Sequence, residues 1–174
     1  MRVASLNVVV AASALLAACS TAPAIHAPDV PAALRPPTDQ VAYLQARATG
    51  VQIYECSQKS DGGFEWAFKA PEATLTSAVG EPLGKHYAGP TWEAVDGSTV
   101  VGEVKAKDAG PTPTAIPWLL LAAKANSGVG VFSNARSVQR LMTIGGVAPG
   151  AACDANALHQ VARVPYTASY FFYR

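Results

Sequence analysis

The sequence predicts an all-β or mainly β fold, an antiparallel sandwich or a partly closed barrel that forms a single domain. Short β-branched and aromatic runs recur along the chain, and turns rich in Gly and Pro separate them. Helical periodicity is poor because 14 Gly and 13 Pro interrupt most windows of helix length. Short strands joined by such turns are typical of sandwiches and barrels.

The first two predicted strands form a hairpin. Residues 51–56 are β-branched and aromatic, and the Asp-Gly-Gly sequence at 61–63 permits the positive φ of a tight turn. Residues 64–69 alternate, so that both Phe residues and Trp66 share one face of the second strand.

The remaining strands follow at similar intervals. Asp96-Gly97 separates residues 91–95 from residues 98–107 and predicts a second hairpin. Residues 118–123 are apolar on both faces, as in a covered central strand or, alternatively, a short buried helix. Residues 137–144 predict another strand, and the aromatic residues 170–173 predict a terminal strand that is paired into the sheet.

Charge and motif spacing argue against several classes of protein. The chain has 13 Lys+Arg against 12 Asp+Glu, whereas nucleic-acid binding needs a basic surface. Residues 80–86 lack the spacing and the Ser/Thr of a phosphate-binding loop. Residues 128–133 come close to a dinucleotide-binding fingerprint, but Ser133 stands where that motif has its third Gly or an Ala. We therefore expect no nucleic-acid partner, no cofactor and no metal site.

The N-terminal residues 1–18 predict an export signal, with Arg2 preceding an apolar stretch and small residues. Residues 16–20, Leu-Ala-Ala-Cys-Ser, resemble the lipobox of bacterial lipoproteins. This resemblance implies that Cys19 carries the lipid, becomes the first mature residue and anchors the protein to a membrane. Ser20 implies, by the same resemblance, the outer membrane of the cell envelope, with the domain facing the periplasm or the cell surface. The alternative is an ordinary secretory signal that contains a cysteine.

Two further features depend on export. Residues 19–40 are rich in Pro and Ala and predict an extended tether before the domain at 41–174, or else an arm that packs on the domain. Cys56 and Cys153 remain after lipidation of Cys19, and an oxidising compartment predicts a disulfide between them. Two separate buried thiols are the alternative.

The segment 84–97 concentrates residues that can carry chemistry. The candidates are His86, Tyr87, Trp92, Glu93 and Asp96. Gly89-Pro90 can reverse the chain so that His86 approaches Glu93 as an acid–base pair or as part of a metal site, with Asp96 orienting the imidazole. Alternatively, these residues are structural: His86 and Tyr87 satisfy backbone groups, Trp92 packs, and Asp96 forms a turn.

Arg140 completes the candidate set. Arg136 and Arg140 lie four residues apart, so they share one face of a strand or helix and could bind an anionic ligand. The alternative is that they pair with carboxylates of the protein or bury their aliphatic stems on its rim.

Several motifs together resemble one family. They are Lys69-Ala70-Pro71-Glu72-Ala73, residues 86–93 (His-Tyr-Ala-Gly-Pro-Thr-Trp-Glu), Ile116-Pro117-Trp118-Leu119-Leu120, residues 138–141, residues 145–149 and residues 164–173. The set is similar to the domain of unknown function 3455, found in secreted bacterial and fungal proteins, over nearly all of residues 31–174. The resemblance implies no established reaction and no catalytic residues.

These observations predict a lipid-anchored envelope protein of unknown activity, whose β module binds a small-molecule or glycan ligand or has a structural role. The alternative is a hydrolase or lyase that acts on envelope material through His86 and Glu93. A concavity near Trp92, Glu93 and Arg140 would favour binding or catalysis over a purely structural role.

Overall fold

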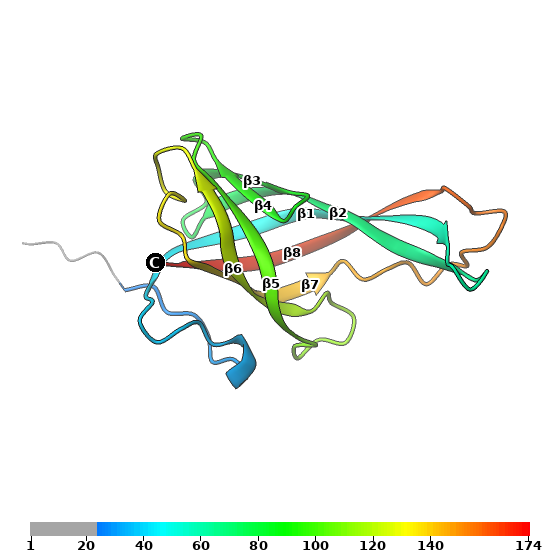
Figure 1. Cartoon of the computed structure of the whole chain (residues 1–174), viewed down its shortest axis with the longest axis horizontal. Coiled ribbons are helices and arrows are strands. Elements are labelled where there is room, and N and C mark those ends of the chain that lie inside the picture. Colours follow the sequence, from blue (N-terminus) through cyan, green and yellow to red (C-terminus); the bar gives the residue numbers. More distant parts are fainter. Residues whose placement is uncertain (1–23) are drawn as a thin grey trace, which may run out of the picture.

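The computed structural model describes residues 24–174, so the predicted export signal and Cys19 lie outside the described residues. Eight antiparallel strands follow one another around a single sheet (Figure 1). They are β1 (Ala42–Gln58), β2 (Phe64–Ser77), β3 (Pro82–Tyr87), β4 (Thr91–Ala94), β5 (Thr99–Asp108), β6 (Trp118–Ser127), β7 (Ser137–Gly145) and β8 (Val161–Tyr173). A short 3₁₀ helix, η1 (Ala32–Leu34), precedes them.

The sheet closes because β1 pairs with both β2 and β8. The predicted antiparallel all-β fold is confirmed. Because the sheet closes on itself, the protein has the barrel form and not the sandwich form. Both predicted hairpins are present, and residues 118–123 belong to β6, which pairs with β5 and β7. Within residues 24–174, no helix has the length and apolar character needed to cross a membrane.

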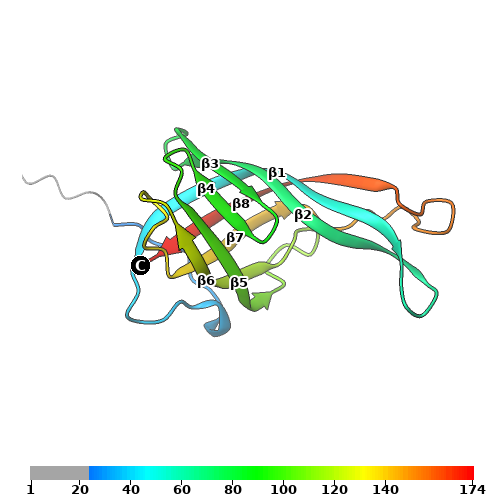
Figure 2. The same cartoon turned by 45° about the horizontal axis from the view of Figure 1, so that its top comes forward.

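The distal half of the β1–β2 hairpin extends beyond the barrel. A bulge between Ile53 and Tyr54 marks the change. On β2, β3 pairs with residues 73–76, so the earlier part of β2 has β1 as its partner and not β3. The loop 146–160 runs beside this hairpin, and the two together form an arm at one end of the molecule (Figures 1 and 2).

A disulfide fixes the arm. Cys56 on β1 is bonded to Cys153 in the loop, and their Cα atoms are 5.5 Å apart. The indole nitrogen of Trp66 donates to the carbonyl of Ala151 at 2.9 Å, which adds a second link between hairpin and loop. The predicted disulfide is therefore confirmed, and its role is to hold a loop that has no strand of its own against β1.

Alternation along β8 divides the apolar residues between two clusters. Tyr170 and Phe172 point into the barrel, where they pack with Trp92 and other buried residues. Phe171 and Tyr173 point outward and form a second cluster with Leu34. Because successive side chains of a strand face opposite sides, one aromatic run supplies both clusters.

Residues 25–34 cover the outer cluster. Leu34 is fully buried there, and its carbonyl accepts a hydrogen bond from the buried amide of Gln139 at 2.6 Å. Ile25 and Val30 pack against the same cluster. This part of the predicted tether is thus an ordered segment that packs on the domain, which was the alternative interpretation. An extended tether is wrong for residues 25–34 because their apolar side chains have a sheet face to cover.

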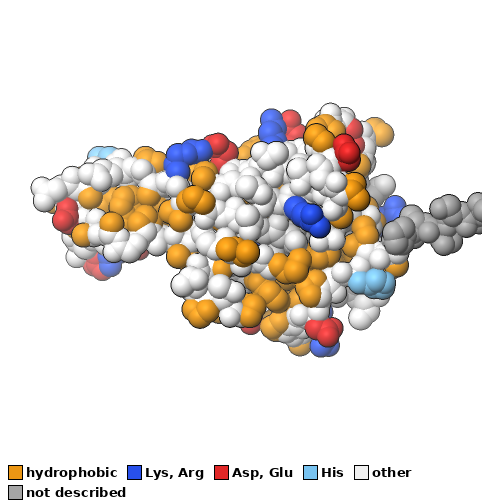
Figure 3. All heavy atoms as spheres, turned by 180° about the vertical axis from the view of Figure 1, so that it is seen from behind, with side chains coloured by type: hydrophobic (Ala, Val, Ile, Leu, Met, Phe, Trp, Pro, Cys, Tyr) orange, Lys and Arg blue, Asp and Glu red, His pale blue; other side chains and the backbone are white. Residues whose placement is uncertain are grey.

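The surface carries few charges. Charged residues make up 14% of the chain, and hydrophobic side chains gather over the barrel body and along the arm on the face shown in Figure 3.

Candidate ligand-binding cavity

A cavity of about 500 Å³ lies at one end of the barrel. The β3–β4 turn, the segment before β6 and the start of the hairpin arm surround it. Its apolar lining includes Tyr54, Phe68, Pro71, Val104, Ile116, Leu119 and Leu121, and its polar lining includes Gln52, His86, Trp92, Arg140 and Tyr170. Three of the six predicted site residues, His86, Trp92 and Arg140, therefore meet at one cavity.

Two stacked rings form part of the cavity wall. His86 and Trp92 are cross-strand partners on β3 and β4, and their ring centroids are 4.6 Å apart with an interplanar angle of 13°. The Tyr170 ring meets both edge-on, at 5.1 Å from His86 and 5.3 Å from Trp92. Gly102 on β5 leaves room for the indole, because a Cβ there would lie 2.9 Å from the Trp92 ring.

The imidazole of His86 is neutral at physiological pH. Its Nδ1 lies 2.8 Å from the carbonyl of Thr91, and since a carbonyl only accepts, Nδ1 carries the proton and donates. Burial lowers the pKa of His86 to about 4, against the opposing effect of the Thr91 bond. The ring therefore contributes an acceptor at Nε2 and no charge.

Several buried polar atoms around the cavity have no hydrogen-bond partner among the described residues. They are the amide nitrogen of Gln52, the indole nitrogen of Trp92 and the hydroxyl of Tyr170. Each of these side chains is at most 2% exposed. The Tyr170 hydroxyl nevertheless lies near Tyr166 and the Arg140 guanidinium, and Tyr166 lies near Gln52, without well-aligned hydrogen bonds. Leaving such a group unpaired costs about 1–3 kcal/mol, so most buried polar groups in proteins are paired. Three such poorly satisfied groups border this one cavity.

Arg140 is held at the cavity by a neighbouring carbonyl. Its Nε and one terminal nitrogen both donate to the carbonyl of Pro117, at 3.1 and 2.9 Å. In the described part of the chain Arg140 forms no ion pair, so for this residue the pairing alternative is wrong. Arg136 does pair with a carboxylate, that of Asp39 at 2.9 Å, and it does not line the cavity.

Glu93 and Tyr87 lie on the other side of the sheet. The register places Lys85 opposite Glu93 and His86 opposite Trp92, so alternation turns Glu93 outward and His86 inward. The Tyr87 hydroxyl donates to the Glu93 carboxylate at 2.8 Å, and Lys85 pairs with it at 3.2 Å. These two contacts, the Tyr87 bond first, lower the pKa of Glu93. The predicted His86–Glu93 pair is therefore wrong.

Asp96 organises a turn and does not orient His86. Its carboxylate accepts hydrogen bonds from the backbone and hydroxyl of Ser98, at 2.9 and 2.6 Å, and from the backbone of Val131 at 2.8 Å. The Ser98 hydroxyl bond, followed by the Val131 bond, lowers the pKa of Asp96. The carboxylate thus joins the β4–β5 turn to the loop after β6, as the turn alternative predicted.

Gln52 and Tyr170 were not among the predicted site residues. Gln52 interrupts an otherwise apolar and β-branched strand on the face that also carries Tyr54 and Cys56, and a polar residue on a buried face is the informative exception. Tyr170 belongs to the terminal aromatic run, whose alternation places its phenol inside. Both signals are present in the sequence, but neither indicates which residues lie opposite.

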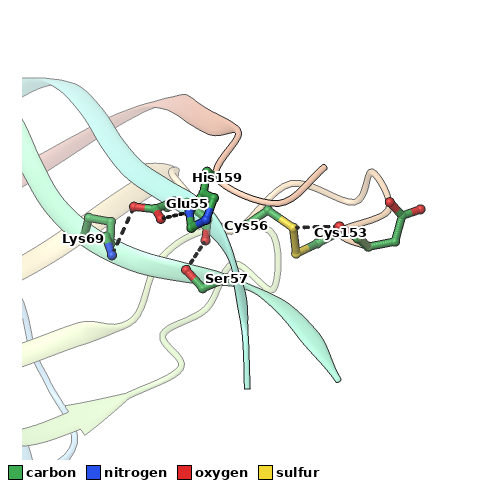
Figure 4. A network of polar contacts seen from close by, with 7 residues as sticks. Glu55, Cys56, Ser57, Lys69, Cys153 and His159 are labelled. Atoms are coloured by element: carbon green, nitrogen blue, oxygen red, sulfur yellow. Dashed lines mark hydrogen bonds and ion pairs between the residues drawn. A yellow bond between two sulfur atoms is a disulfide. The ribbon is translucent and has the colours of Figure 1, made fainter. Parts of the chain in front are cut away.

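A second polar cluster lies on the arm beside the disulfide (Figure 4). The Glu55 carboxylate lies between His159 Nδ1 at 3.1 Å and Lys69 Nζ at 3.2 Å. His159 and then Lys69 lower the pKa of Glu55. All three side chains are partly or largely exposed, so this network contributes little stability. Among the residues described, no group of three or more His, Cys, Asp or Glu side chains could hold a metal.

Together, these features define a small antiparallel barrel with a disulfide-fixed arm and a cavity at one end, a class of fold that commonly encloses small ligands. Residues 36–174 match the family described as Protein of unknown function (DUF3455), and the chain belongs to this family. No curated protein and no solved structure matches the chain significantly.

Proposed function

We propose that this is a lipid-anchored cell-envelope protein whose barrel binds a small, largely apolar molecule in its end cavity. A volume of about 500 Å³ suits a ligand of metabolite or short lipid size. The cavity wall is aromatic and aliphatic, with a small number of polar atoms that can fix the orientation of a ligand.

The observation that carries this proposal is the set of unpaired donors. The nitrogen of Gln52, the indole nitrogen of Trp92 and the hydroxyl of Tyr170 border the same cavity and have no well-aligned hydrogen-bond partner among residues 24–174. A barrel that served only as a scaffold would gain stability from apolar residues at these positions. A bound molecule with acceptor atoms gives these donors a function. The alternative function, a hydrolase or lyase, depended on an acid–base pair of His86 and Glu93, and these two side chains lie on opposite faces of the sheet.

Binding can be tested with a substitution at the cavity mouth. Val104 lines the cavity and is 49% exposed, so Val104→Trp fills the mouth without disturbing buried packing. Val95 is 74% exposed and lies away from the cavity, which makes Val95→Trp the matched control. We expect saturable calorimetric binding of decanoate or decan-1-ol to the wild type and to Val95→Trp, with about tenfold weaker binding to Val104→Trp. Equal affinities for the two variants would contradict the proposal.

Envelope location rests on the export signal at 1–18, the lipobox around Cys19 and the disulfide. A Cys56–Cys153 bond is stable in an oxidising compartment such as the periplasm and uncommon in the cytosol. The test is intact mass analysis of protein recovered from its native host, with Cys19→Ala as control. Loss of residues 1–18 and an acyl adduct on Cys19 are expected. An intact Met1 without acylation would refute the location.

A further inference from the structure

We infer that the ligand is an amphipathic anion, an apolar molecule that ends in a carboxylate, and that Arg140 binds its charged end. This inference rests on the proposed function and specifies the ligand class of the same cavity.

The charge of the cavity lining has one sign. The charged side chains that line it are Lys69, Lys107 and Arg140, and no Asp or Glu among residues 24–174 lines it. Lys69 is paired with Glu55, which leaves Arg140 and Lys107 without an ion pair in the described chain. His86 stays neutral because burial lowers its pKa. A cavity with apolar walls and net positive charge favours an anionic occupant.

Arg140 is preorganised to bind a carboxylate. Nε and one terminal nitrogen of the guanidinium are fixed on the Pro117 carbonyl, and the group also lies beside the Tyr170 hydroxyl. Leu119 and Tyr170 are its cross-strand neighbours on β6 and β8, so the guanidinium lies between an apolar wall and the Tyr170 phenol. Charged hydrogen bonds from arginine to a carboxylate are among the strongest in proteins.

The unpaired groups at the cavity are mainly donors. The nitrogens of Gln52 and Trp92 donate only, and the Tyr170 hydroxyl can donate as well. Burial raises the pKa of Tyr170 well above its ordinary value, so this hydroxyl keeps its proton. Such groups match the acceptor-only oxygens of a carboxylate better than the donor and acceptor of an alcohol.

Polarity also differs between the floor and the mouth of the cavity. Gln52, Trp92 and Tyr170 are buried, whereas Phe68 is 53% and Val104 49% exposed. We therefore place the charged end of the ligand toward Arg140 and the buried donors, and its apolar end between Phe68 and Val104. Lys107, exposed on the same lining, attracts an anion toward the opening.

The test compares two probes of equal chain length, decanoate and decan-1-ol, below the concentration at which decanoate forms micelles. Affinities are measured by titration calorimetry at neutral pH for the wild type, Arg140→Gln and Arg136→Gln. Arg136→Gln is the matched control because it removes the same charge from an exposed ion pair outside the cavity. Circular dichroism and the thermal midpoint verify folding, and Arg140→Lys keeps a charge if the glutamine variant does not fold.

Wild type and Arg136→Gln should bind decanoate about tenfold more tightly than decan-1-ol, and Arg140→Gln should lose this preference because its decanoate binding weakens about tenfold relative to its binding of the alcohol. Arg140→Lys should retain part of the preference. If wild type and Arg140→Gln bind both probes equally, the inference fails while cavity binding stands. If neither probe binds the wild type, both the inference and the proposed function fail.

Discussion

Lowering the pH from about 7.5 to about 5 should reduce the free energy of unfolding by about 2 kcal/mol through His86 alone. The imidazole has a pKa of 6.5 in an unfolded chain, and burial lowers it to about 4 in the folded protein. Between these values the unfolded state holds one proton more than the folded state. Stability is therefore fully present above pH 6.5 and is lost as the pH falls toward 4, by roughly 3 kcal/mol in all.

The assay is urea unfolding followed by tryptophan fluorescence, at several pH values between about 5 and 7.5 and with the disulfide intact. His86→Asn removes the titrating group and keeps an N–H donor for the Thr91 carbonyl, so its stability should depend much less on pH. The variant also loses ring stacking on Trp92, and for this reason the pH slopes are compared and not the absolute stabilities.

His159→Asn is the control, because this histidine is 77% exposed in its side chain and pairs with Glu55 at the surface. Its pH slope should match the wild type more closely than the slope of His86→Asn does. If wild type and His86→Asn lost the same stability between about pH 7.5 and 5, His86 would not be buried in its neutral form.

Three further substitutions test the fold. Cys56→Ser with Cys153→Ser opens a 97-residue loop, and chain entropy sets an upper limit of about 4.7 kcal/mol on the loss, measurable by urea unfolding; no change would mean that the arm is fixed by other contacts. Leu34→Ala should cost about 2–5 kcal/mol, because this residue is fully buried against the outer face of the sheet; a neutral result by thermal unfolding would show that residues 25–34 do not pack there. Asp96→Asn should speed proteolysis of the loop 128–134, since the carboxylate holds the backbone of Val131; unchanged cleavage would contradict this role.

The fold was largely predictable because its signals are local. Asp96-Gly97 and the cluster at 61–63 mark turns, and alternation in the terminal aromatic run fixes which side chains enter the barrel. β1 begins at Ala42, well before the predicted strand at 51, because the Ala-rich stretch there has weak β propensity and is kept in the sheet by pairing on both sides.

The site was predictable only in part. Gly89-Pro90 does reverse the chain, but in a hairpin the register decides which residues share a face. Here His86 is paired with Trp92 and not with Glu93, so the Glu93 side chain lies on the opposite face of the sheet. The cavity also takes Gln52, Arg140 and Tyr170 from strands far apart in sequence, and only barrel closure brings them to His86 and Trp92. Long-range pairing of this kind is not encoded in any short segment.

The most direct test of ligand binding in the cavity is the indole N–H resonance of Trp92 in two-dimensional NMR during titration with decanoate. The other two indoles serve as internal comparison, because Trp66 is bonded to Ala151 on the arm and Trp118 packs in the outer cluster. We expect a saturable shift of the Trp92 indole resonance, whereas the resonances of Trp66 and Trp118 stay unchanged. A Trp92 resonance that stays in place throughout the titration, or three indoles that move together, would contradict it.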